Sequence, residues 1–212
     1  MSKQFLRIGA KPILFYTLHQ FDLCPAVDEI ILVVKAEDLA FAAQEIVDRY
    51  GIQKVKRIVA GGAERQDSVY AGLQAIANES EIVVIHDGVR PFISVALLEL
   101  GIQQCREFGA VVTAVPVTST IKRAEKGIVQ TTLDRSELWE IQTPQIFRYD
   151  LIRSAYEESR KDGFVATDDA MMVERLGMSV QILPGERRNI KITTREDMAY
   201  AAFLLEKEKC SE

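Results

Sequence analysis

The run Ile30-Ile31-Leu32-Val33-Val34 decides the fold class of this chain, because four of its five residues are β-branched and a polar break follows at once. A continuous apolar run of this length is typical of a strand that is covered on both faces. Similar runs occupy residues 55–59, 82–85 and 110–117, and later ones follow at 180–183 and 189–193. The sequence therefore predicts a sheet that is buried between two layers.

Amphipathic stretches with helical period alternate with these strands. They cover residues 13–21, 39–50, 67–77, 95–108, 151–159 and 168–176, and a closing helix at 195–207 has Thr194 as its N-cap. This alternation predicts an α/β, Rossmann-like fold with a mostly parallel sheet and helices on both faces. A chain of 212 residues, 48% of them apolar, is long enough to form a single domain over residues 1–212.

The interval 117–138 differs from the rest of the chain. Its residues alternate between apolar and polar, threonine is frequent, and Gly127 separates two short strand-like pieces. This pattern favours a hairpin, so we expect a protruding β-arm here.

Charge and cysteine content limit the classes of partner. The net charge of −5 opposes binding to nucleic acid, whereas a free nucleotide carried with Mg²⁺ remains compatible. Cys24, Cys105 and Cys210 have no metal-ligand or disulfide-framework spacing, so we expect reduced thiols in a cytoplasmic protein. The sequence has no leader pattern and no run of eighteen apolar residues, so we expect neither a signal peptide nor a membrane span.

The first candidate site is the loop Gly61-Gly62-Ala63-Glu64-Arg65-Gln66-Asp67-Ser68, which follows a predicted strand and opens a predicted helix. Two glycines permit close backbone approach and positive φ, and a helix start offers free N–H groups to an anion or to the polar edge of a base. The alternative is a plain turn with Asp67 or Ser68 as N-cap. The residues alone leave both interpretations open.

The second candidate is Ile85-His86-Asp87-Gly88-Val89-Arg90-Pro91, at the carboxyl end of a strongly apolar strand, where open α/β sheets bind their ligands. Asp87 could hold Mg²⁺, and the guanidinium of Arg90 matches phosphate oxygens. The alternative is a structural Asp–Arg pair that caps a turn. We expect His86 to be structural, because no second histidine or acid lies at ligand spacing.

A third group lies on and after the predicted arm: Thr118-Ser119-Thr120, Asp134-Arg135-Ser136 and Gln142-Thr143-Pro144-Gln145. Hydroxyl groups and one arginine suit a phosphorylated polyol, although a solvated hairpin with no specific role is equally compatible. Lys191 stands in an apolar segment, where its side chain points either into water or toward an anionic ligand.

In this order, the motifs resemble the 2-C-methyl-D-erythritol 4-phosphate cytidylyltransferase family of the non-mevalonate isoprenoid route. The resemblance extends from Lys3 to about Leu205 and also includes Thr167-Asp168-Asp169-Ala170 and Asn189-Ile190-Lys191. It implies a nucleotidyltransferase fold related to glycosyltransferases of the A type. It also implies that the enzyme transfers CMP from CTP to 2-C-methyl-D-erythritol 4-phosphate and releases pyrophosphate, with Mg²⁺ as cofactor.

The resemblance also implies a role for each matching residue. Lys3 would stabilise the pentavalent phosphorus, Arg135 and Lys191 would position the polyol phosphate, and Asp87 would contribute to metal binding. Asp87, Arg90, Thr120 and Thr143 would complete the substrate site, and Gly61, Gly62 and Ser68 would contact the cytosine.

The family's β-arm reaches across a homodimer, so residues 117–138 would serve dimerisation, and Thr120 and Arg135 would enter the neighbouring subunit's site. Family members begin with an apolar strand and an Ala-Ala-Gly-x-Gly-x-Arg loop before the lysine that matches Lys3, and we expect that segment to be encoded upstream of Met1. Two alternatives remain open: a ribitol 5-phosphate cytidylyltransferase, and a non-catalytic paralogue that binds a sugar phosphate.

Overall fold

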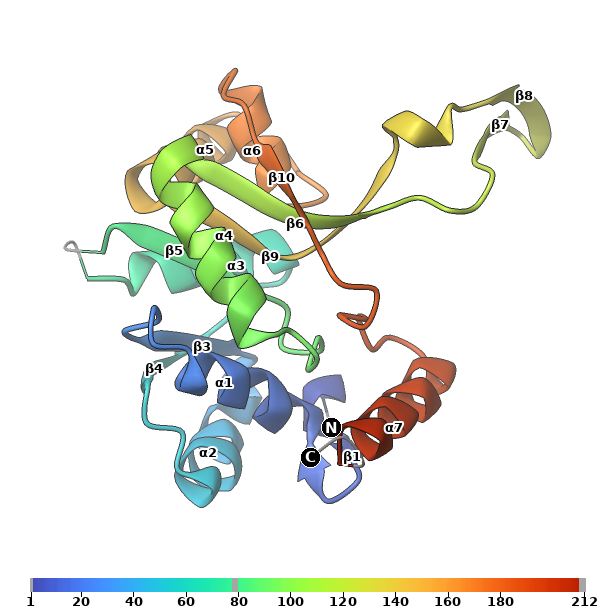
Figure 1. Cartoon of the computed structure of the whole chain (residues 1–212). Helices are drawn as coiled ribbons and strands as arrows, with labels where there is room; N and C mark the ends of the chain where they lie inside the picture. The colour runs from blue at the N-terminus through green and yellow to red at the C-terminus, as the bar shows by residue number, and fades with distance from the viewer. Residues whose placement is uncertain (1, 78–79, 210–212) are drawn as a thin grey trace.

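The computed structural model describes residues 2–77 and 80–209, and a four-stranded sheet forms its centre (Figure 1). The strands of this sheet lie in the order β10 (Gln181–Pro184), β6 (Ala110–Pro116), β9 (Trp139–Arg148) and β5 (Ile82–Ile85). β10 is parallel to β6, whereas β9 is antiparallel to both of its neighbours. A separate parallel pair consists of β3 (Ile30–Val34) and β4 (Val55–Ala60).

Helices connect and cover the strands close to the predicted positions. They are α1 (Ile13–Leu23), α2 (Leu39–Phe41) with its π-helical continuation η3 (Ala42–Asp48), α3 (Arg65–Gln74), α4 (Val95–Phe108), α5 (Tyr149–Lys161), α6 (Ala170–Arg175) and α7 (Arg195–Lys209). Near the start, η1 (Lys3–Phe5) precedes a small antiparallel pair, β1 (Arg7–Ile8) and β2 (Lys11–Pro12). Single 3₁₀ turns lie at η2 (Ala36–Asp38) and η4 (Arg135–Glu137). In the ranges described, none of the helices combines the length and the apolar character that crossing a membrane requires.

The central sheet is buried on both faces, and neighbouring residues on one strand serve opposite layers. Val111 and Ile146 pack in the cluster that includes Leu98 of α4, whereas Val112 and Phe147 pack in the cluster of α5 and α6. This follows from the period of two in a strand, which sends successive side chains to opposite faces. The predicted α/β class with helices on both faces is therefore confirmed.

Two details of the predicted sheet were wrong. β9 was not predicted, because Gln142, Thr143 and Gln145 interrupt the apolar pattern, although all three are buried in the structure. Since β9 is antiparallel to β5 and β6, the sheet is mixed instead of mostly parallel. Residues 189–193 do not form a strand; the segment makes an isolated contact in which the Ile192 N–H donates to the carbonyl of Val89.

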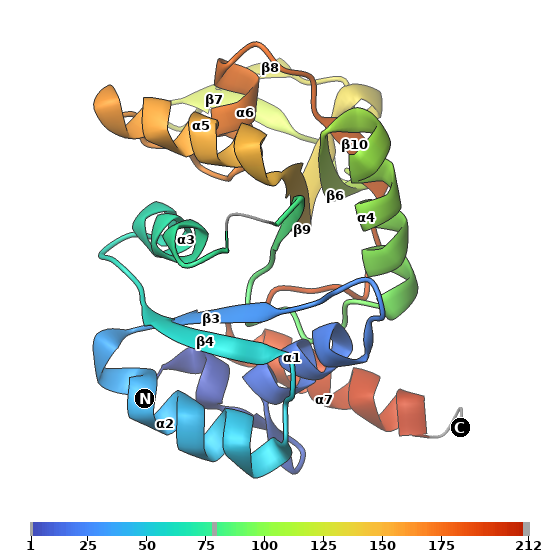
Figure 2. The same cartoon turned by 90° about the vertical axis from the view of Figure 1, so that its left-hand side faces the viewer.

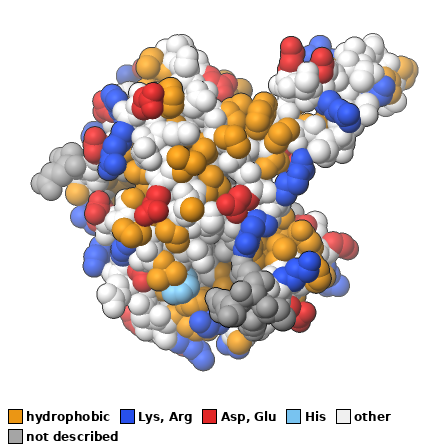
Figure 3. Space-filling view, viewed as in Figure 1, with side chains coloured by type: hydrophobic (Ala, Val, Ile, Leu, Met, Phe, Trp, Pro, Cys, Tyr) orange, Lys and Arg blue, Asp and Glu red, His pale blue; other side chains and the backbone are white. Residues whose placement is uncertain are grey.

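The predicted β-arm is present as the hairpin of β7 (Lys122–Glu125) and β8 (Ile128–Thr132). Lys126 and Gly127 turn the chain with φ of +48° and +80°, the paired positive values that a tight two-residue hairpin loop requires. The arm extends away from the body of the molecule, with apolar atoms at its tip (Figures 1 and 3). Ile128 and Val129 are 68% and 57% exposed, so this tip is an uncovered apolar surface within the chain.

A cavity of about 1030 Å³ separates β3 from β5. Within the described residues, β3 pairs with β4 alone and β5 pairs with β9 alone, so each has one edge without a neighbouring strand (Figure 2). The lining is apolar along both strands and polar beyond them: Asp28, Glu29 and Glu81 contribute before the strands, and Gln4, Arg65 and Asp87 contribute elsewhere. The candidate site described next lies at the polar end that Asp87 borders.

Candidate active site

Asp87 lies two residues after the end of β5, and three cationic side chains converge on its carboxylate. Lys191 Nζ lies 3.0 Å from Oδ2, Arg90 Nε lies 3.5 Å from Oδ2, and Arg65 Nε lies 3.3 Å from Oδ1. Burial by itself would raise the pKa of Asp87, but the charges of Arg65 and Lys191 outweigh it and lower the pKa to about 2. Asp87 is therefore ionised at neutral pH and faces a cluster with an excess of positive charge.

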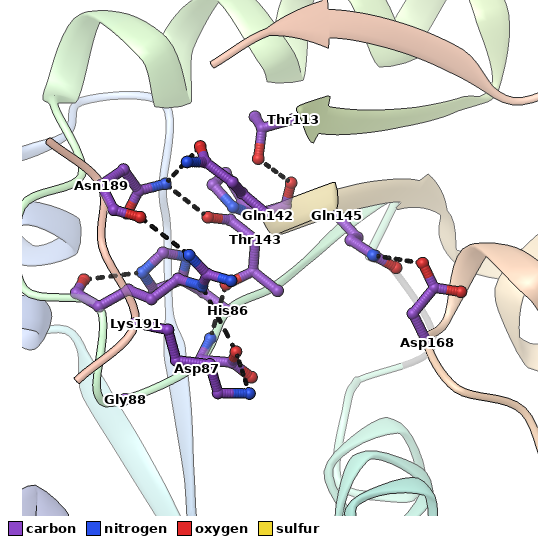
Figure 4. A network of polar contacts seen from close by, with 12 residues as sticks. His86, Asp87, Gly88, Thr113, Gln142, Thr143, Gln145, Asp168, Asn189 and Lys191 are labelled. Atoms are coloured by element: carbon purple, nitrogen blue, oxygen red, sulfur yellow. Dashed lines mark hydrogen bonds and ion pairs between the residues drawn. The ribbon is translucent and has the colours of Figure 1, made fainter. Parts of the chain in front are cut away.

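Lys191 is held against Asp87 by the segment that carries it. Asn189, fully buried, donates from Nδ2 to the carbonyl of Thr143 at 2.8 Å, and the Ile192 N–H donates to the carbonyl of Val89 at 2.9 Å (Figure 4). These two bonds fix the backbone on either side of Lys191. The structure therefore decides between the two interpretations of this lysine: its ammonium group contacts Asp87 at the cavity, while its side chain is 42% exposed.

Arg90 is largely inside the protein. Its Nη1 donates to the carbonyl of Asn189 at 2.8 Å, and its backbone N–H donates to the carbonyl of Asp87 at 3.0 Å. Burial lowers the pKa of Arg90, and the charge of Asp87 opposes that shift. The Asp–Arg pair that we considered as the structural alternative is therefore present. The guanidinium group of Arg90 contacts the carboxylate of Asp87 within this turn.

His86 and Thr143 support the same turn. His86 Nε2 lies 3.0 Å from the carbonyl of Arg90, and burial lowers the pKa of His86 to about 4, so the ring is neutral at pH 7. Thr143 Oγ1 accepts a hydrogen bond from the Asp87 N–H at 3.0 Å, which ties the turn to β9 (Figure 4). Both contacts agree with a structural role for His86 and place Thr143 directly beside the predicted site.

The glycine pair lies against the start of its own helix. A Cβ at Gly61 would overlap Ser68 Oγ, and a Cβ at Gly62 would overlap Asp67 Cβ. Neither glycine has positive φ, so close approach is the property that the loop requires. The alternative of a turn with Asp67 or Ser68 as N-cap does not hold in this form: α3 begins at Arg65 after the N-cap Glu64, whose N–H donates to the Asp67 carboxylate.

Ser68 closes this loop. Its Oγ accepts from the Gly62 N–H at 3.2 Å and lies 3.2 Å from the Glu64 carbonyl, to which it donates. Ser68 also lines the cavity between β3 and β5. The residues predicted to contact a base therefore form one compact, partly exposed loop at the rim of that cavity.

Lys3 lies near the same rim. Its Nζ donates to the carbonyl of Thr193 at 3.4 Å, two residues beyond Lys191, and the next residue, Gln4, lines the cavity. Asp87, Arg90 and Lys191 therefore meet at one point, and Lys3 contacts the segment that carries Lys191.

The comparison with known proteins identifies the family. The model of the family described as 2-C-methyl-D-erythritol 4-phosphate cytidylyltransferase matches residues 1–207. The chain belongs to this family. Two relatives with the family's name illustrate the match: the protein of Geobacter metallireducens is 47% identical over 211 residues, which cover 98% of this chain and 91% of the relative. The protein of Geobacillus kaustophilus is 47% identical over 206 residues, which cover 97% of this chain and 89% of the relative.

Solved structures of cytidylyltransferases share the fold. The 4-diphosphocytidyl-2C-methyl-D-erythritol synthase of Anaerococcus prevotii superposes with a TM-score of 0.87 at 35% identity, covering 94% of this chain and 88% of that one. The cytidylyltransferase of Thermus thermophilus gives 0.81 at 30% identity, covering 96% and 94%. The overall fold of this chain, including its mixed sheet, therefore matches that of solved cytidylyltransferases.

Two predicted cytidylyltransferase site residues lie elsewhere in this chain. Thr120 is exposed at the base of the arm, and Arg135 lies in η4 with its Nη1 donating to the carbonyl of Thr118 at 3.0 Å. The arm leads away from the cavity (Figure 1). A single chain thus does not bring Thr120 and Arg135 to Asp87.

Sequence reasoning missed three residues that the fold brings to the site. Arg65 contacts Asp87 and also Asp169, and Asp169 accepts a hydrogen bond from the hydroxyl group of Tyr156. Arg65 and Asp169 both stand in stretches that carry the family resemblance, but 104 positions separate them. The spacing of these residues in the sequence gives no indication that they are in contact.

The site offers few metal ligands. Within the described part of the chain, no group of three or more His, Cys, Asp or Glu side chains lies close enough to hold a metal ion. Asp87 is one carboxylate among three cations, so a metal ion there would have to take most of its ligands from elsewhere, such as the phosphate oxygens of a bound substrate. Cys24 and Cys105 are free thiols and both are buried, whereas Cys210 lies outside the described residues.

Proposed function

We propose that this chain transfers CMP from CTP to 2-C-methyl-D-erythritol 4-phosphate, giving 4-diphosphocytidyl-2-C-methyl-D-erythritol and pyrophosphate. The observation that carries the proposal is the position of Asp87 with Lys191 and Arg90 at a cavity rim, in a member of the cytidylyltransferase family. Two phosphate-bearing substrates repel each other, and a cluster with excess positive charge reduces that repulsion.

The reaction needs no covalent intermediate with the enzyme. A phosphate oxygen of the polyol substrate attacks the α-phosphorus of CTP in line, the bond to the bridging oxygen breaks, and pyrophosphate leaves. Lys3 and Lys191 offer ammonium groups where negative charge develops on the phosphorus oxygens. Arg90 and Thr143 act mainly by holding the Asp87 turn, since both are engaged with backbone groups there.

Mg²⁺ completes this proposal as the cofactor. Mg²⁺ is commonly bound by one or two carboxylates together with substrate phosphates, and Asp87 supplies one such carboxylate. When bound, the ion neutralises part of the triphosphate charge. Asp87 is already ionised in the protein, so it needs no deprotonation before it meets a cation.

Cytosine recognition is assigned to Gly61, Gly62 and Ser68. Backbone groups and a hydroxyl of this loop can hydrogen-bond to the amine and carbonyl of the base. The bond between the Gly62 N–H and Ser68 Oγ keeps this surface in one shape before a ligand arrives.

The β-arm is proposed to join two chains into a homodimer. An exposed apolar tip at Ile128 and Val129 is unfavourable in water and gains stability when a partner covers it. In such a dimer Thr120 and Arg135 would reach the partner's cavity and contact the polyol phosphate. This accounts for their distance from Asp87 within one chain.

The experiment that tests the function is a pyrophosphate-release assay of the full-length protein, with the expected segment upstream of Met1 included, and with CTP, Mg²⁺ and 2-C-methyl-D-erythritol 4-phosphate. Release that depends on both substrates supports the proposal, and no release contradicts it. A parallel assay with ribitol 5-phosphate tests the nearest alternative, against which the names of the relatives argue. Calorimetry tests the non-catalytic alternative, which predicts polyol phosphate binding without CTP binding.

A cytoplasmic location stays a prediction, as does the absence of nucleic acid and membrane partners.

A further inference from the structure

Arg65 joins two carboxylates that come from distant parts of the chain. Its Nε lies 3.3 Å from Asp87 Oδ1, and its Nη2 lies 2.7 Å from Asp169 Oδ2. The donors of a guanidinium are fixed in one plane, so the orientation of one carboxylate is tied to that of the other. Arg65 is the first residue of α3 and lines the same cavity as Asp87.

Asp169 gives this arrangement a fixed end. Its exposed fraction is 0%, its Oδ1 accepts a hydrogen bond from the Tyr156 hydroxyl group, and its backbone N–H donates to Gln145 Oε1 at 3.1 Å. Tyr156 is itself fully buried within the cluster of α5 and α6. A carboxylate with these partners cannot move without disturbing the core, so it anchors Arg65.

Asp87 is the end that borders the cavity. Its Oδ2 faces Arg90 and Lys191, and the side chain of Lys191 is 42% exposed at the cavity. Under the proposed function Lys191 turns toward a substrate phosphate, and its contact with Oδ2 is then weakened. The contact of Arg65 with Oδ1 lies on the opposite side of the carboxylate and remains.

We propose that Arg65 is a positioning residue, which holds the carboxylate of Asp87 toward the cavity by anchoring it to Asp169 and Tyr156. This inference rests on the proposed function, because Asp87 must act on a bound substrate for its orientation to affect turnover. Charge alone does not suffice: a lysine at position 65 would keep the positive charge, but one ammonium group cannot span both carboxylates in a fixed plane.

Steady-state kinetics of R65K test the proposal. We expect kcat to fall by about 10- to 100-fold, with KM for each substrate within about threefold of wild type, because misplacement of a catalytic group acts mainly on the transition state. The variant Y156F removes only the hydroxyl group behind Asp169, and we expect a kcat loss of about 3- to 10-fold, again without a large change in KM. A kcat within threefold of wild type in R65K, or a loss confined to KM, overturns the inference.

R153Q is the matched control. Arg153 lies on α5, as Tyr156 does, and its ion pair of 2.9 Å is with Glu157 of the same helix, with both side chains about half exposed. We expect wild-type kinetics from R153Q. If R65K does not fold, Y156F decides in its place, and unchanged kcat in folded Y156F then overturns the anchor.

A crystal structure of unliganded R65K gives a result that does not depend on activity. We expect the Asp87 carboxylate to leave its wild-type rotamer in R65K and to keep it in R153Q. An unchanged rotamer in R65K overturns the positioning role. If the wild-type chain shows no cytidylyl transfer, the proposed function fails by itself, and this crystallographic comparison still decides whether Arg65 orients Asp87.

Discussion

The ammonium group of Lys191 lies 3.0 Å from the carboxylate of Asp87, although 104 positions of sequence separate the two residues. The pair joins the turn after β5 to the segment that leads into α7, and it stands at the polar end of the cavity between β3 and β5. Because Lys191 is partly exposed while Asp87 is nearly buried, the lysine can turn to a ligand and the carboxylate cannot easily follow.

Replacement of Lys191 by methionine should lower turnover far more than it lowers stability. A single cation aimed at developing charge is worth about 10²- to 10³-fold in rate, by analogy with one oxyanion donor. The measurement is kcat by pyrophosphate release, with the thermal midpoint as a check on folding. A kcat within threefold of the wild-type value would show that Lys191 does not contribute to catalysis.

The proposed reach of the arm predicts complementation between two inactive variants. R135M and K191M should each be inactive, because each dimer site combines Lys191 of one chain with Arg135 of the other. When the two are mixed and allowed to exchange, half of the dimers are hybrids with one intact site, so activity should return to roughly a quarter of wild type. No recovery after verified exchange would place both residues in one chain's site.

The glycine loop predicts a selective effect on CTP. G62A should displace the start of α3, since the added Cβ overlaps Asp67 Cβ, and should raise KM for CTP by about tenfold, equivalent to about 1.4 kcal/mol. KM for the polyol phosphate should change little. A63S alters an exposed neighbour and serves as the control; an equal rise of both KM values in G62A would contradict the assignment to cytosine.

The cap of α7 predicts a pH-dependent contribution to stability. The Asp197 carboxylate accepts from the N–H groups of Thr193 and Thr194, both at 2.8 Å, and the Asp197 N–H donates to Thr194 Oγ1, which confirms Thr194 as a cap. The two backbone N–H groups lower the pKa of Asp197 to about 2, from an ordinary value of 3.8. The carboxylate therefore stabilises the fold fully above pH 3.8, and this stabilisation is lost as the pH falls toward 2.

Urea unfolding of wild type and D197A at several pH values checks this prediction. At pH 7 the variant should be less stable by about 1 kcal/mol, the usual value of a helix cap. The difference should narrow between pH 4 and pH 2. A gap that stays constant down to pH 2 would show that the carboxylate charge of Asp197 does not contribute.

Local pattern predicted much of this fold. Residues 30–34, 82–85 and 95–108 have the observed bounds of β3, β5 and α4, because continuous apolar runs and a helical period are properties of neighbouring residues. β9 was not predicted because Gln142 and Gln145 are polar residues, which a sequence pattern assigns to the surface. In the fold both side chains are buried. Their partners, Asn189 and the backbone of Asp169, lie far away in sequence.

The residues of the candidate site also fall into those that the sequence predicted and those that only the structure revealed. Asp87 and Lys191 were found through motifs, and the structure shows them in contact. The Arg65–Asp169–Tyr156 arrangement depends on three elements that meet only after folding, α3, α5 and the turn before α6, so no local pattern announces it.

The Gly61 loop and the Asp87 turn are supported by different strands. Within the described residues, β3 supports the Gly61 loop through the Gly61 N–H bond to the Val34 carbonyl, while β5 leads into Asp87. A change that shifts β3 relative to β5 would therefore alter the distance between the loop proposed to contact cytosine and the Asp87 carboxylate.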